Sequence, residues 1–408
     1  MRIAITSNGP GEFSGWVRPL VAALLRLAPD TDVSLFFVPD DYATGREAQV
    51  AERMFPRAHV IAPRDYVRFA LGAALEGVPE SVDVVQYLGG DLLHARRVRA
   101  RLGGGGRSYK FARKSEAKRL DGAFAIDAKN ARELERAGFA PERVAVVGNL
   151  VVDGALGEAA GLFGASAEAG FEPDGVLVMP GTRRHEVANL VPMFLQMAVH
   201  LRALRPALPI AFGISPFTSD DELARALARG GEYRTVWGTR GRVVPHASGI
   251  ALEAEGGPAF PVVRDAMRHA ARARLVVTLP GTKCIELAAL GVPAIVCVPL
   301  NAPEAVVING PLQYVDRIPF AGTFLKRAMV IAVDLRFPFT AQPNIDTSEM
   351  LMPELRGTQM PGDMARRVAA YADNEPARIL AARRLRDLYV AHAGAAERMA
   401  RSLLEAYA

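Results

Sequence analysis

The chain has 408 residues, of which 50% are hydrophobic and 23% charged, so global disorder is excluded and a large core in two or three domains is possible. A net charge of +5 is a mild basic excess, and we expect no nucleic-acid partner from it. Two cysteines cannot build a disulfide framework. The N-terminus runs directly into a strand pattern without a signal peptide, and no uncharged stretch reaches the roughly 18 residues of a spanning helix. We therefore expect a cytoplasmic protein.

Short apolar runs alternate with longer helical patterns, which is typical of parallel sheets with helices on both faces. In the first part we predict strands at 2–7, 32–38, 58–61, 82–88, 122–126 and 143–147, with helices at 19–28, 65–74, 92–102 and 128–137. A turn-prone stretch rich in Ala, Gly and Glu follows at 154–174 and is the predicted interdomain connection. The same alternation then begins again with a strand at 175–179 and a helix at 186–205.

The predicted fold class is α/β, with two facing, doubly wound Rossmann-like domains. We expect them at residues 1–160 and 170–374, followed by amphipathic helices at 375–408 that pack back on the first domain. Ligands of open α/β sheets bind at the carboxyl ends of the strands, so the predicted ligand cleft lies between the two domains.

The segment after the first predicted strand is Asn8-Gly9-Pro10-Gly11-Glu12-Phe13-Ser14-Gly15-Trp16. Its glycines would let backbone approach a ligand, and the next helix would direct its N-terminus toward the same place. An ordinary Gly-rich turn is the alternative. The segment has neither the Lys-Ser/Thr of a phosphate-binding loop nor the complete dinucleotide pattern.

In the second part, a buried strand is followed by Pro180-Gly181-Thr182-Arg183-Arg184-His185-Glu186. A Gly turn, a hydroxyl and two guanidinium groups at a helix start suit a diphosphate. Helix capping by Thr182 and Glu186 is the alternative.

A similar element, Pro280-Gly281-Thr282-Lys283-Cys284-Ile285-Glu286, follows the strand predicted at 275–279. Gly281 and Thr282 would donate to phosphate, and Glu286, one turn inside the helix, could accept both hydroxyls of a ribose. A cap with a surface Glu is the alternative. Two such elements in one domain are better explained by one shared nucleoside-diphosphate ligand.

Asp91 follows the strand at 82–88, at the edge where a catalytic base would face the cleft, and a capping aspartate is the alternative. Asp83 and Glu12 also lie near strand edges. Many Lys and Arg residues at 96–119, interrupted by Tyr109 and Phe111, predict either a solvated basic face or a contact with an anionic head group. The scattered histidines and cysteines form no metal-binding pattern, so we predict no metal and no cofactor.

Three segments resemble, in order and spacing, the signature segments of lipid A disaccharide synthase: Pro180-Gly181-Thr182-Arg183…Glu186-Val187, Gly281-Thr282…Glu286-Leu287 and Pro343-Asn344…Pro353-Glu354-Leu355. Two more, Gly148-Asn149…Asp153 and Gly11-Glu12…Ser14-Gly15, are similar to that family's first-domain segments. The resemblance spans nearly the whole chain. It implies a GT-B fold, a UDP-activated acyl-glucosamine donor, release of UDP without a metal, and work at the inner membrane surface.

The resemblance assigns donor binding to Thr182, Arg183, Glu186, Gly281, Thr282, Glu286, Asn344 and Glu354. We place the acceptor side in the first domain, at Gly11, Ser14, Gly15 and Tyr109, with Asp91 or else Glu12 as the predicted catalytic base. The chain departs from the family in the first domain, where Trp16 replaces an acidic residue, Gly90-Asp91-Leu92-Leu93 replaces Pro-Asp-Phe-Asn, and residues 108–114 replace a Trp-rich stretch. A different acceptor is therefore expected.

Three hypotheses follow. The first is an inverting, metal-independent glycosyltransferase that moves an N-acetyl- or N-acyl-glucosamine from UDP to a lipid or glycolipid acceptor at an anionic membrane surface. The second is a UDP-sugar epimerase on the same fold, which requires a pair of acid–base residues that the sequence does not reveal. The third is a non-catalytic, membrane-associated relative that keeps only the fold.

Overall fold

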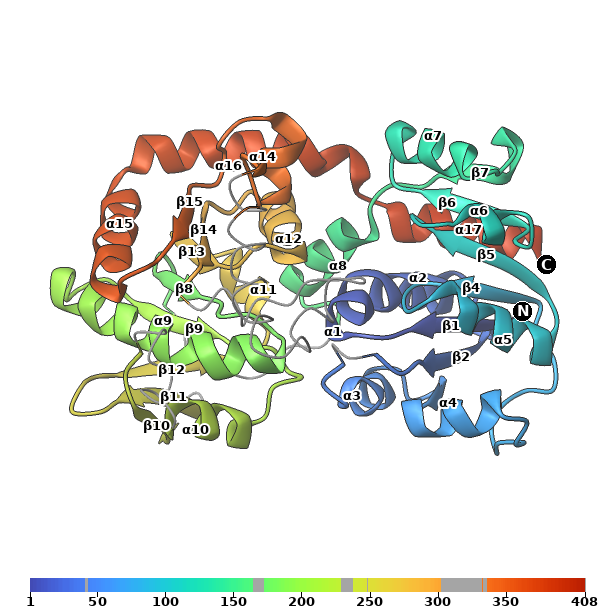
Figure 1. Cartoon of the computed structure of the whole chain (residues 1–408), viewed down its shortest axis with the longest axis horizontal. Helices are drawn as coiled ribbons and strands as arrows, with labels where there is room; N and C mark the ends of the chain where they lie inside the picture. The colour runs from blue at the N-terminus through green and yellow to red at the C-terminus, as the bar shows by residue number, and fades with distance from the viewer. Residues whose placement is uncertain are drawn as a thin grey trace. The chain divides into compact units, whose positions relative to one another are not determined.

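The computed structural model describes residues 1–40, 43–163, 172–228, 238–247, 249–301, 332 and 336–407. The chain divides into two compact units: a first unit of Met1–Gly164 with Tyr389–Ala408, and a second unit of Ala165–Leu388. In each unit, helices flank a mostly parallel sheet (Figure 1). The predicted α/β class with two Rossmann-like domains is therefore confirmed.

The sheet of the first unit has the order β3-β2-β1-β4-β5-β6-β7, with every pair parallel. Its strands are β1 (Arg2–Ser7), β2 (Asp32–Phe37), β3 (His59–Ile61), β4 (Val84–Tyr87), β5 (Gly105–Tyr109), β6 (Gly122–Ala125) and β7 (Val144–Val146). Ala4 and Val85 join a core cluster with Tyr66 and Val98 on one face. Because Ile3 and Ile5, which alternate with Ala4, are also fully buried, both faces of the sheet are covered.

The helical elements of the first unit are α1 (Pro10–Glu12), a π-helical turn (Phe13–Val17), α2 (Arg18–Leu27), α3 (Glu47–Met54), α4 (Pro63–Ala70), α5 (Leu92–Leu102), α6 (Lys114–Ala117), α7 (Ala128–Arg136), a 3₁₀ turn (Pro141–Arg143), α8 (Leu150–Ala159), a second 3₁₀ turn (Val390–His392) and α17 (Ala395–Ala406).

Helical structure begins at Pro10, directly after β1, and not at residue 19 as predicted. Proline at the first helical position is preorganised for the helix, and its missing N–H is not needed there. The segment that we expected as a Gly-rich loop is therefore a short α-turn followed by a π-helical turn, a feature that is frequent at functional sites.

Strand β5 was missed because three of the residues at and before its start, Gly104, Gly105 and Gly106, lack the β-branched character of a strand. The reason for glycine is close contact. A Cβ atom on Gly104 would lie 2.4 Å from the carbonyl oxygen of Val82, and one on Gly105 would lie 2.6 Å from Cζ of Tyr407. The tail of the chain therefore packs directly on this strand.

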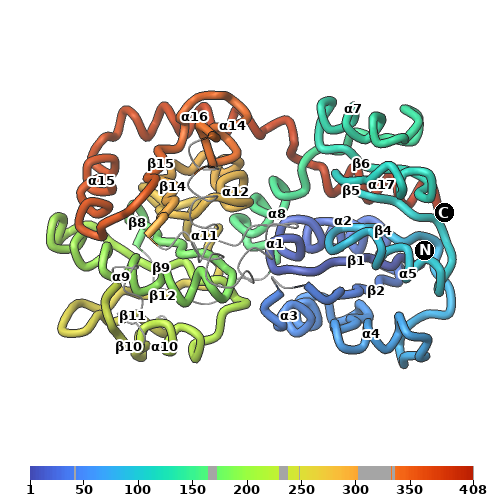
Figure 2. The backbone as a smooth tube through the Cα atoms, in the orientation of Figure 1, coloured from blue at the N-terminus to red at the C-terminus, as the bar shows by residue number. Residues whose placement is uncertain are grey.

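Helix α17 returns to the first unit and lies beside α2 (Figure 2). Asp153 of α8 accepts hydrogen bonds from the backbone N–H groups of Gly394 at 2.7 Å and Ala396 at 2.5 Å, so a carboxylate 243 residues away caps the helix. Arg398 donates to the carbonyl oxygen of Val147 at 2.7 Å.

Asp153→Ala is expected to loosen α17 by about 0.5–2 kcal/mol, the usual effect of removing an N-cap. Amide hydrogen exchange should accelerate in α17 and stay unchanged in the second unit. Glu397→Ala, which removes the exposed ion pairs with Arg26 and Arg401, is the matched control in the same helix. Equal exchange in the Asp153→Ala and wild-type proteins would contradict this assignment.

The sheet of the second unit has the order β10-β11-β12-β9-β8-β13-β14-β15. Its strands are β8 (Val176–Val178), β9 (Ile210–Gly213), β10 (Gly241–His246), β11 (Gly249–Ala254), β12 (Ala259–Val263), β13 (Leu275–Thr278), β14 (Ala294–Pro299) and β15 (Glu354–Gly357). The pairs β10–β11 and β11–β12 are antiparallel, so an antiparallel edge extends the parallel sheet. A strand considered at 235–236 lies outside the described residues.

The helices of the second unit are α9 (Arg184–Leu204), α10 (Asp220–Ala228), α11 (Ala266–Ala270), α12 (Thr282–Leu290), α14 (Gln342–Thr347), α15 (Pro361–Asp373) and α16 (Glu375–Tyr389). Among the described residues, α9 alone is long and apolar enough to cross a membrane. It contacts α10 and α15, and Phe194, Leu195 and Leu201 on it are fully buried in the core of the unit.

The C-terminal helices are divided between the units. Helix α16 belongs to the second unit, except for its last residue, because Arg378 donates to the carbonyl oxygen of Arg274 and Arg384 pairs with Glu349. Only the end of the segment expected at 375–408, including α17, returns to the first unit.

Candidate functional site

Each sheet has one point at which the strand order reverses, and ligands of open α/β sheets bind there. In the second unit this point lies between β8 and β13, which pair directly, with Val178 opposite Val277. The segments after these two strands are the two Gly-Thr elements that the sequence analysis identified. The fold therefore brings Gly181 and Gly281 to the same edge of the sheet.

The two elements share the pattern Gly-Thr-basic-x-x-Glu, at 181–186 and at 281–286. They nevertheless start their helices differently. Helix α9 begins at Arg184, so Glu186 is its third residue, whereas α12 begins at Thr282, so Glu286 is its fifth.

Glu186 caps its own helix. Its Oε2 atom accepts from the backbone N–H groups of Thr182 at 2.9 Å and Arg183 at 3.0 Å. Gly181 has φ +102°, and a Cβ atom there would lie 2.8 Å from Cβ of Glu186, so glycine is required beneath the cap. The N–H groups that we expected to bind diphosphate at this helix are thus occupied by a protein carboxylate.

The start of α12 is open. Pro280, Gly281 and Thr282 are all exposed, and no side chain of the described residues caps the helix at its N-cap residue, Gly281. A Cβ atom on Gly281 would meet nothing within 4 Å. The backbone N–H groups and the partial positive charge of a helix start favour an anion, so α12 is the better phosphate site of the two.

Glu286 is buried directly below this start, with 6% of its side chain exposed, and its Oε2 atom lies 2.5 Å from Nζ of Lys283. Its predicted contact with a ribose stays a prediction. Lys283, which the sequence analysis did not select, is 26% exposed and adds a cation to the same place.

Asn344 and Glu354 were expected to bind the donor, but the structure gives them another role. Glu354, 1% exposed, accepts from the N–H groups of Thr340 and Ala341 and from the Asn344 side chain, all at 2.9 Å. Asn344 also donates to and accepts from the backbone of Met352. Both side chains therefore fasten α14 to β15.

In the first unit the strand order reverses between β1 and β4. Gly89 and Gly90 follow β4, and the absence of side chains lets Asn8, Glu12 and Val38 lie against them. A Cβ atom on Gly89 would lie 2.5 Å from Oδ1 of Asn8 and 3.2 Å from Cβ of Glu12. Among the described residues, Oδ1 of Asn8 and Oγ of Ser7 are buried without a hydrogen-bond partner. Such groups normally have a partner, so this edge suits a polar ligand.

Asp91 and Glu12 both lie at this edge. Burial, followed by the charges of Glu12 and Asp91, raises the pKa of Tyr87 to about 12, so both carboxylates are close to one phenol. Asp91 is the N-cap of α5, accepting from the N–H of Leu93 at 2.9 Å, and its other oxygen lies 3.2 Å from Arg113. The capping role given as the alternative is thus present. With 45% of its side chain exposed, Asp91 also remains accessible.

His94, one turn after Asp91, was missed because a single histidine in a helix has no distinctive spacing. Its Nδ1 atom lies 2.7 Å from the hydroxyl of Tyr66 in α4. Burial lowers the pKa of His94, against an opposing contribution from Asp91, so the imidazole favours its neutral form at neutral pH. The edge therefore holds two carboxylates and a neutral imidazole.

The four residues predicted on the acceptor side lie in different surroundings. Tyr109 is fully buried and cannot reach an acceptor, because its hydroxyl donates to Gly148 and accepts from Leu150 at the start of α8. Gly15 lies against α8, where a Cβ atom would come 3.2 Å from Val151. Gly11 and Ser14 are half-buried in the helical start after β1.

Much of the basic stretch at 96–119 is paired within the first unit. Arg99 binds Asp121 and the carbonyl oxygen of Gly104, Arg101 lies over the Phe69 ring, and Arg96 pairs with Glu116. Exposed side chains in and just before this stretch include Leu93, Arg97, Phe111, Lys114 and Lys118, here called the Phe111 surface.

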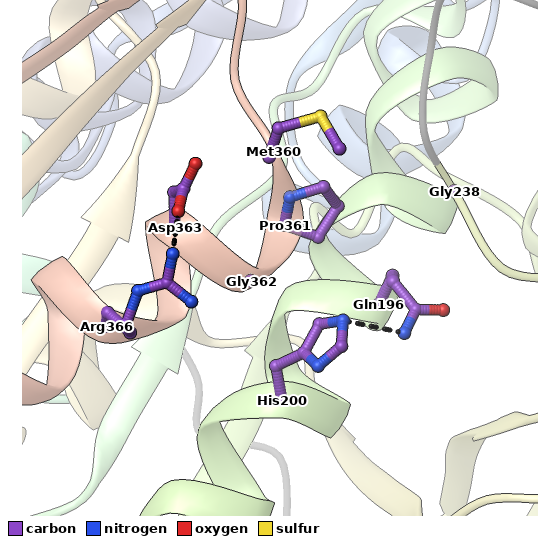
Figure 3. Close-up of a pocket in the computed structure, with 8 residues that line it drawn as sticks. All are labelled: Gln196, His200, Gly238, Met360, Pro361, Gly362, Asp363 and Arg366. Atoms are coloured by element: carbon purple, nitrogen blue, oxygen red, sulfur yellow. Dashed lines mark hydrogen bonds and ion pairs between the residues drawn. The ribbon is translucent and has the colours of Figure 1, made fainter.

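A separate pocket of about 490 Å³ lies between α9 and α15 (Figure 3). Gln196 and His200 line it on α9, and the start of α15 lines it with Asp363 and Arg366, which pair with each other. These α9 residues are 12 to 16 positions beyond Arg184, or about 18–24 Å along the helix, so the pocket is distinct from the strand-reversal site. No group of His, Cys, Asp and Glu suited to a metal occurs in the part of the chain that the structure describes.

No protein-family model and no curated protein sequence matches the chain. Solved structures do match it over nearly their full length. One is MnaA of S. aureus, solved with UDP (13% identity, 98% of this chain and 95% of that chain, TM-score 0.53). Another is the UDP-GlcNAc 2-epimerase of Neisseria meningitidis, solved with UDP-GlcNAc (9% identity, 99% and 100%, TM-score 0.54). A third is the glycotransferase of kitacinnamycin (15% identity, 100% and 99%, TM-score 0.52).

The chain therefore shares with these structures a fold of two Rossmann-like domains in sequence, the GT-B architecture that the sequence predicted. At these identities the likeness is one of fold. It does not extend to lipid A disaccharide synthase in particular, nor to a lipid acceptor or a membrane.

Proposed function

We propose that this protein binds a UDP-sugar, with the diphosphate at the open start of α12, and transforms the sugar by acid–base chemistry from the first unit. The observation that carries the proposal is the contrast between the two Gly-Thr elements. One helix start is closed by Glu186, whereas the other is exposed, uncapped and next to Lys283 and Glu286. The UDP and UDP-GlcNAc bound to the matching structures support the nucleotide.

Epimerisation is the first candidate reaction. It needs one group that removes a proton from the sugar and another that returns it. Glu12, Asp91 and His94 lie at the strand-reversal edge of the first unit and would supply such groups; the sequence predicted the two carboxylates, and the fold adds the histidine. The matching UDP-GlcNAc 2-epimerases also support this reaction.

Transfer to an acceptor hydroxyl is the second candidate. It is supported by the matching glycotransferase and by the order of the two Gly-Thr elements, which resembles that of lipid A disaccharide synthase. Here Asp91 or Glu12 would deprotonate the acceptor, and the start of α12 with Lys283 would stabilise the leaving UDP. A lipid or glycolipid acceptor at the inner face of the cytoplasmic membrane belongs to this candidate.

Incubation with UDP-GlcNAc, with and without lipid extract, separates the two reactions. An epimerase changes the configuration of the sugar without lipid and keeps it attached to UDP. A transferase releases UDP, and does so only when an acceptor is present. Neither product, together with no binding of UDP by calorimetry, would contradict the proposed function.

Glu286→Ala is expected to weaken UDP binding by about 1–3 kcal/mol, the usual cost of leaving hydrogen-bonding groups unpaired. The matched control is Glu186→Ala, at the same place in the repeated pattern, which is not expected to weaken binding because Glu186 only caps α9. Calorimetry on both variants tests this. Unchanged UDP affinity in Glu286→Ala would show that the ribose does not bind to this carboxylate.

We also propose that the Phe111 surface associates with anionic membranes. Its exposed side chains combine cations with the apolar Leu93 and Phe111, 44% and 49% exposed. Binding to anionic vesicles is expected to weaken with salt, because exposed charges are screened over about 8 Å at physiological ionic strength. Phe111→Ser with Lys114→Gln should reduce it further. Equal sedimentation with neutral and anionic vesicles at low salt would contradict the association.

A further inference from the structure

The pair formed by Lys283 and Glu286 lies at the start of α12, three residues apart on one helix face. We propose that this pair exchanges partners when a nucleotide binds: Lys283 moves from the carboxylate to the diphosphate, and Glu286 then accepts the ribose hydroxyls. The inference rests on the proposed function and extends it to the way in which the site selects its ligand.

The first argument is electrostatic. Glu286 is 6% exposed and its oxygen lies 2.5 Å from the Lys283 ammonium, so the cation compensates a buried charge. Leaving such a carboxylate without a partner is strongly unfavourable. Anything that draws Lys283 away must therefore supply new donors to Glu286.

Few ligands can draw Lys283 away and also supply donors to Glu286. A diphosphate at the start of α12, where Gly281 and Thr282 are exposed, would attract the lysine, but by itself it would leave Glu286 unpaired. A ribose alone would offer donors to a carboxylate that still holds its lysine. Only a ligand with both parts satisfies the cation and the carboxylate together, so the site should favour a nucleoside diphosphate over either fragment.

The third argument is the contrast with α9. Glu186 occupies the same position in the pattern as Glu286, but two backbone N–H groups hold it, and the guanidinium of Arg183 lies 3.6 Å from its other oxygen. A carboxylate fixed by the backbone cannot exchange partners with a side chain. The exchange is therefore specific to α12.

Calorimetry with UDP, uridine and pyrophosphate on the whole protein tests the proposal. Lys283→Met is expected to weaken UDP binding by about 10- to 100-fold, the range of one charge-assisted hydrogen bond, and to leave uridine binding no weaker. Glu286→Gln is expected to weaken uridine binding but to strengthen pyrophosphate binding, because it releases the lysine. Lys283→Arg keeps the cation and should retain most of the UDP affinity. Lys118→Met controls for the loss of one positive charge.

Equal losses of UDP and uridine affinity in Lys283→Met would overturn the exchange, because they would indicate a structural role for the lysine. Pyrophosphate binding that is unchanged in Glu286→Gln would overturn it as well. In both cases the wild-type protein still binds UDP, so the proposed function stands. Failure of the wild-type protein to bind UDP would overturn both.

Discussion

Asp91→Asn is expected to lower the turnover of a UDP-sugar by about 10²–10⁴-fold, the typical contribution of a general base. Asparagine keeps the shape and polarity of the side chain but cannot accept the proton. It also keeps the N-cap of α5, because asparagine caps as well as aspartate, so the hydrogen bond from the N–H of Leu93 is preserved. The measurement is the rate of product formation, with UDP affinity and melting temperature recorded on the same protein.

Two controls are the UDP affinity of Asp91→Asn and the turnover and stability of Asp91→Ala. UDP affinity in Asp91→Asn is expected to equal that of the wild type, because the nucleotide is assigned to the second unit. Asp91→Ala should lose turnover and also about 1 kcal/mol of stability, because the cap is removed as well. A folded Asp91→Asn protein with wild-type turnover would show that Asp91 is not the base, and Glu12→Gln would be the next variant to test.

Glu354→Ala is expected to destabilise the second unit by about 3–5 kcal/mol, as when one partner of a buried charged network is removed. The N–H groups of Thr340 and Ala341 would lose their acceptor, and the amide of Asn344 one of its two, in a place where only 1% of the Glu354 side chain is exposed. Denaturant unfolding of the second unit measures the loss, and faster amide exchange at 340–347 should locate it.

Glu349→Ala is the matched control a few residues away. Its carboxylate pairs with Arg384 on the surface, and such exposed pairs contribute little. A Glu354→Ala protein as stable as Glu349→Ala would mean that Glu354 does not hold α14 to β15. In that case the donor-binding role predicted from the sequence would have to be considered again.

Much of the fold could be predicted from local pattern. The alternation of apolar runs and helical stretches predicted β1, β2, β4, β6 and most of their helices, because buried parallel strands and amphipathic helices each have a distinct period. That pattern did not predict the Gly-rich β5 or the antiparallel strands β10 and β11. Glycines in β5 serve contacts with Val82 and Tyr407, which are remote in sequence.

The sequence by itself also determined where ligands should bind, since residues directly after parallel strands must lie at one edge of the sheet. Gly181 and Gly281, as well as Glu12 and Asp91, do lie at the strand-reversal points of their sheets. Only the tertiary structure decided what each residue does there. Tyr109 is buried against α8, and His94 meets Tyr66 across 28 positions of the chain.

The clearest case is the repeated pattern Gly-Thr-basic-x-x-Glu. Its two copies are equivalent in sequence, yet α9 begins two residues later in the pattern than α12. That shift brings Glu186 onto the free N–H groups of its helix and leaves Glu286 a turn further in, beside Lys283. A carboxylate at the third position of a helix can reach those N–H groups, whereas one at the fifth lies in the body of the helix. The residue at which the surrounding fold starts each helix therefore determines which copy is open to a ligand.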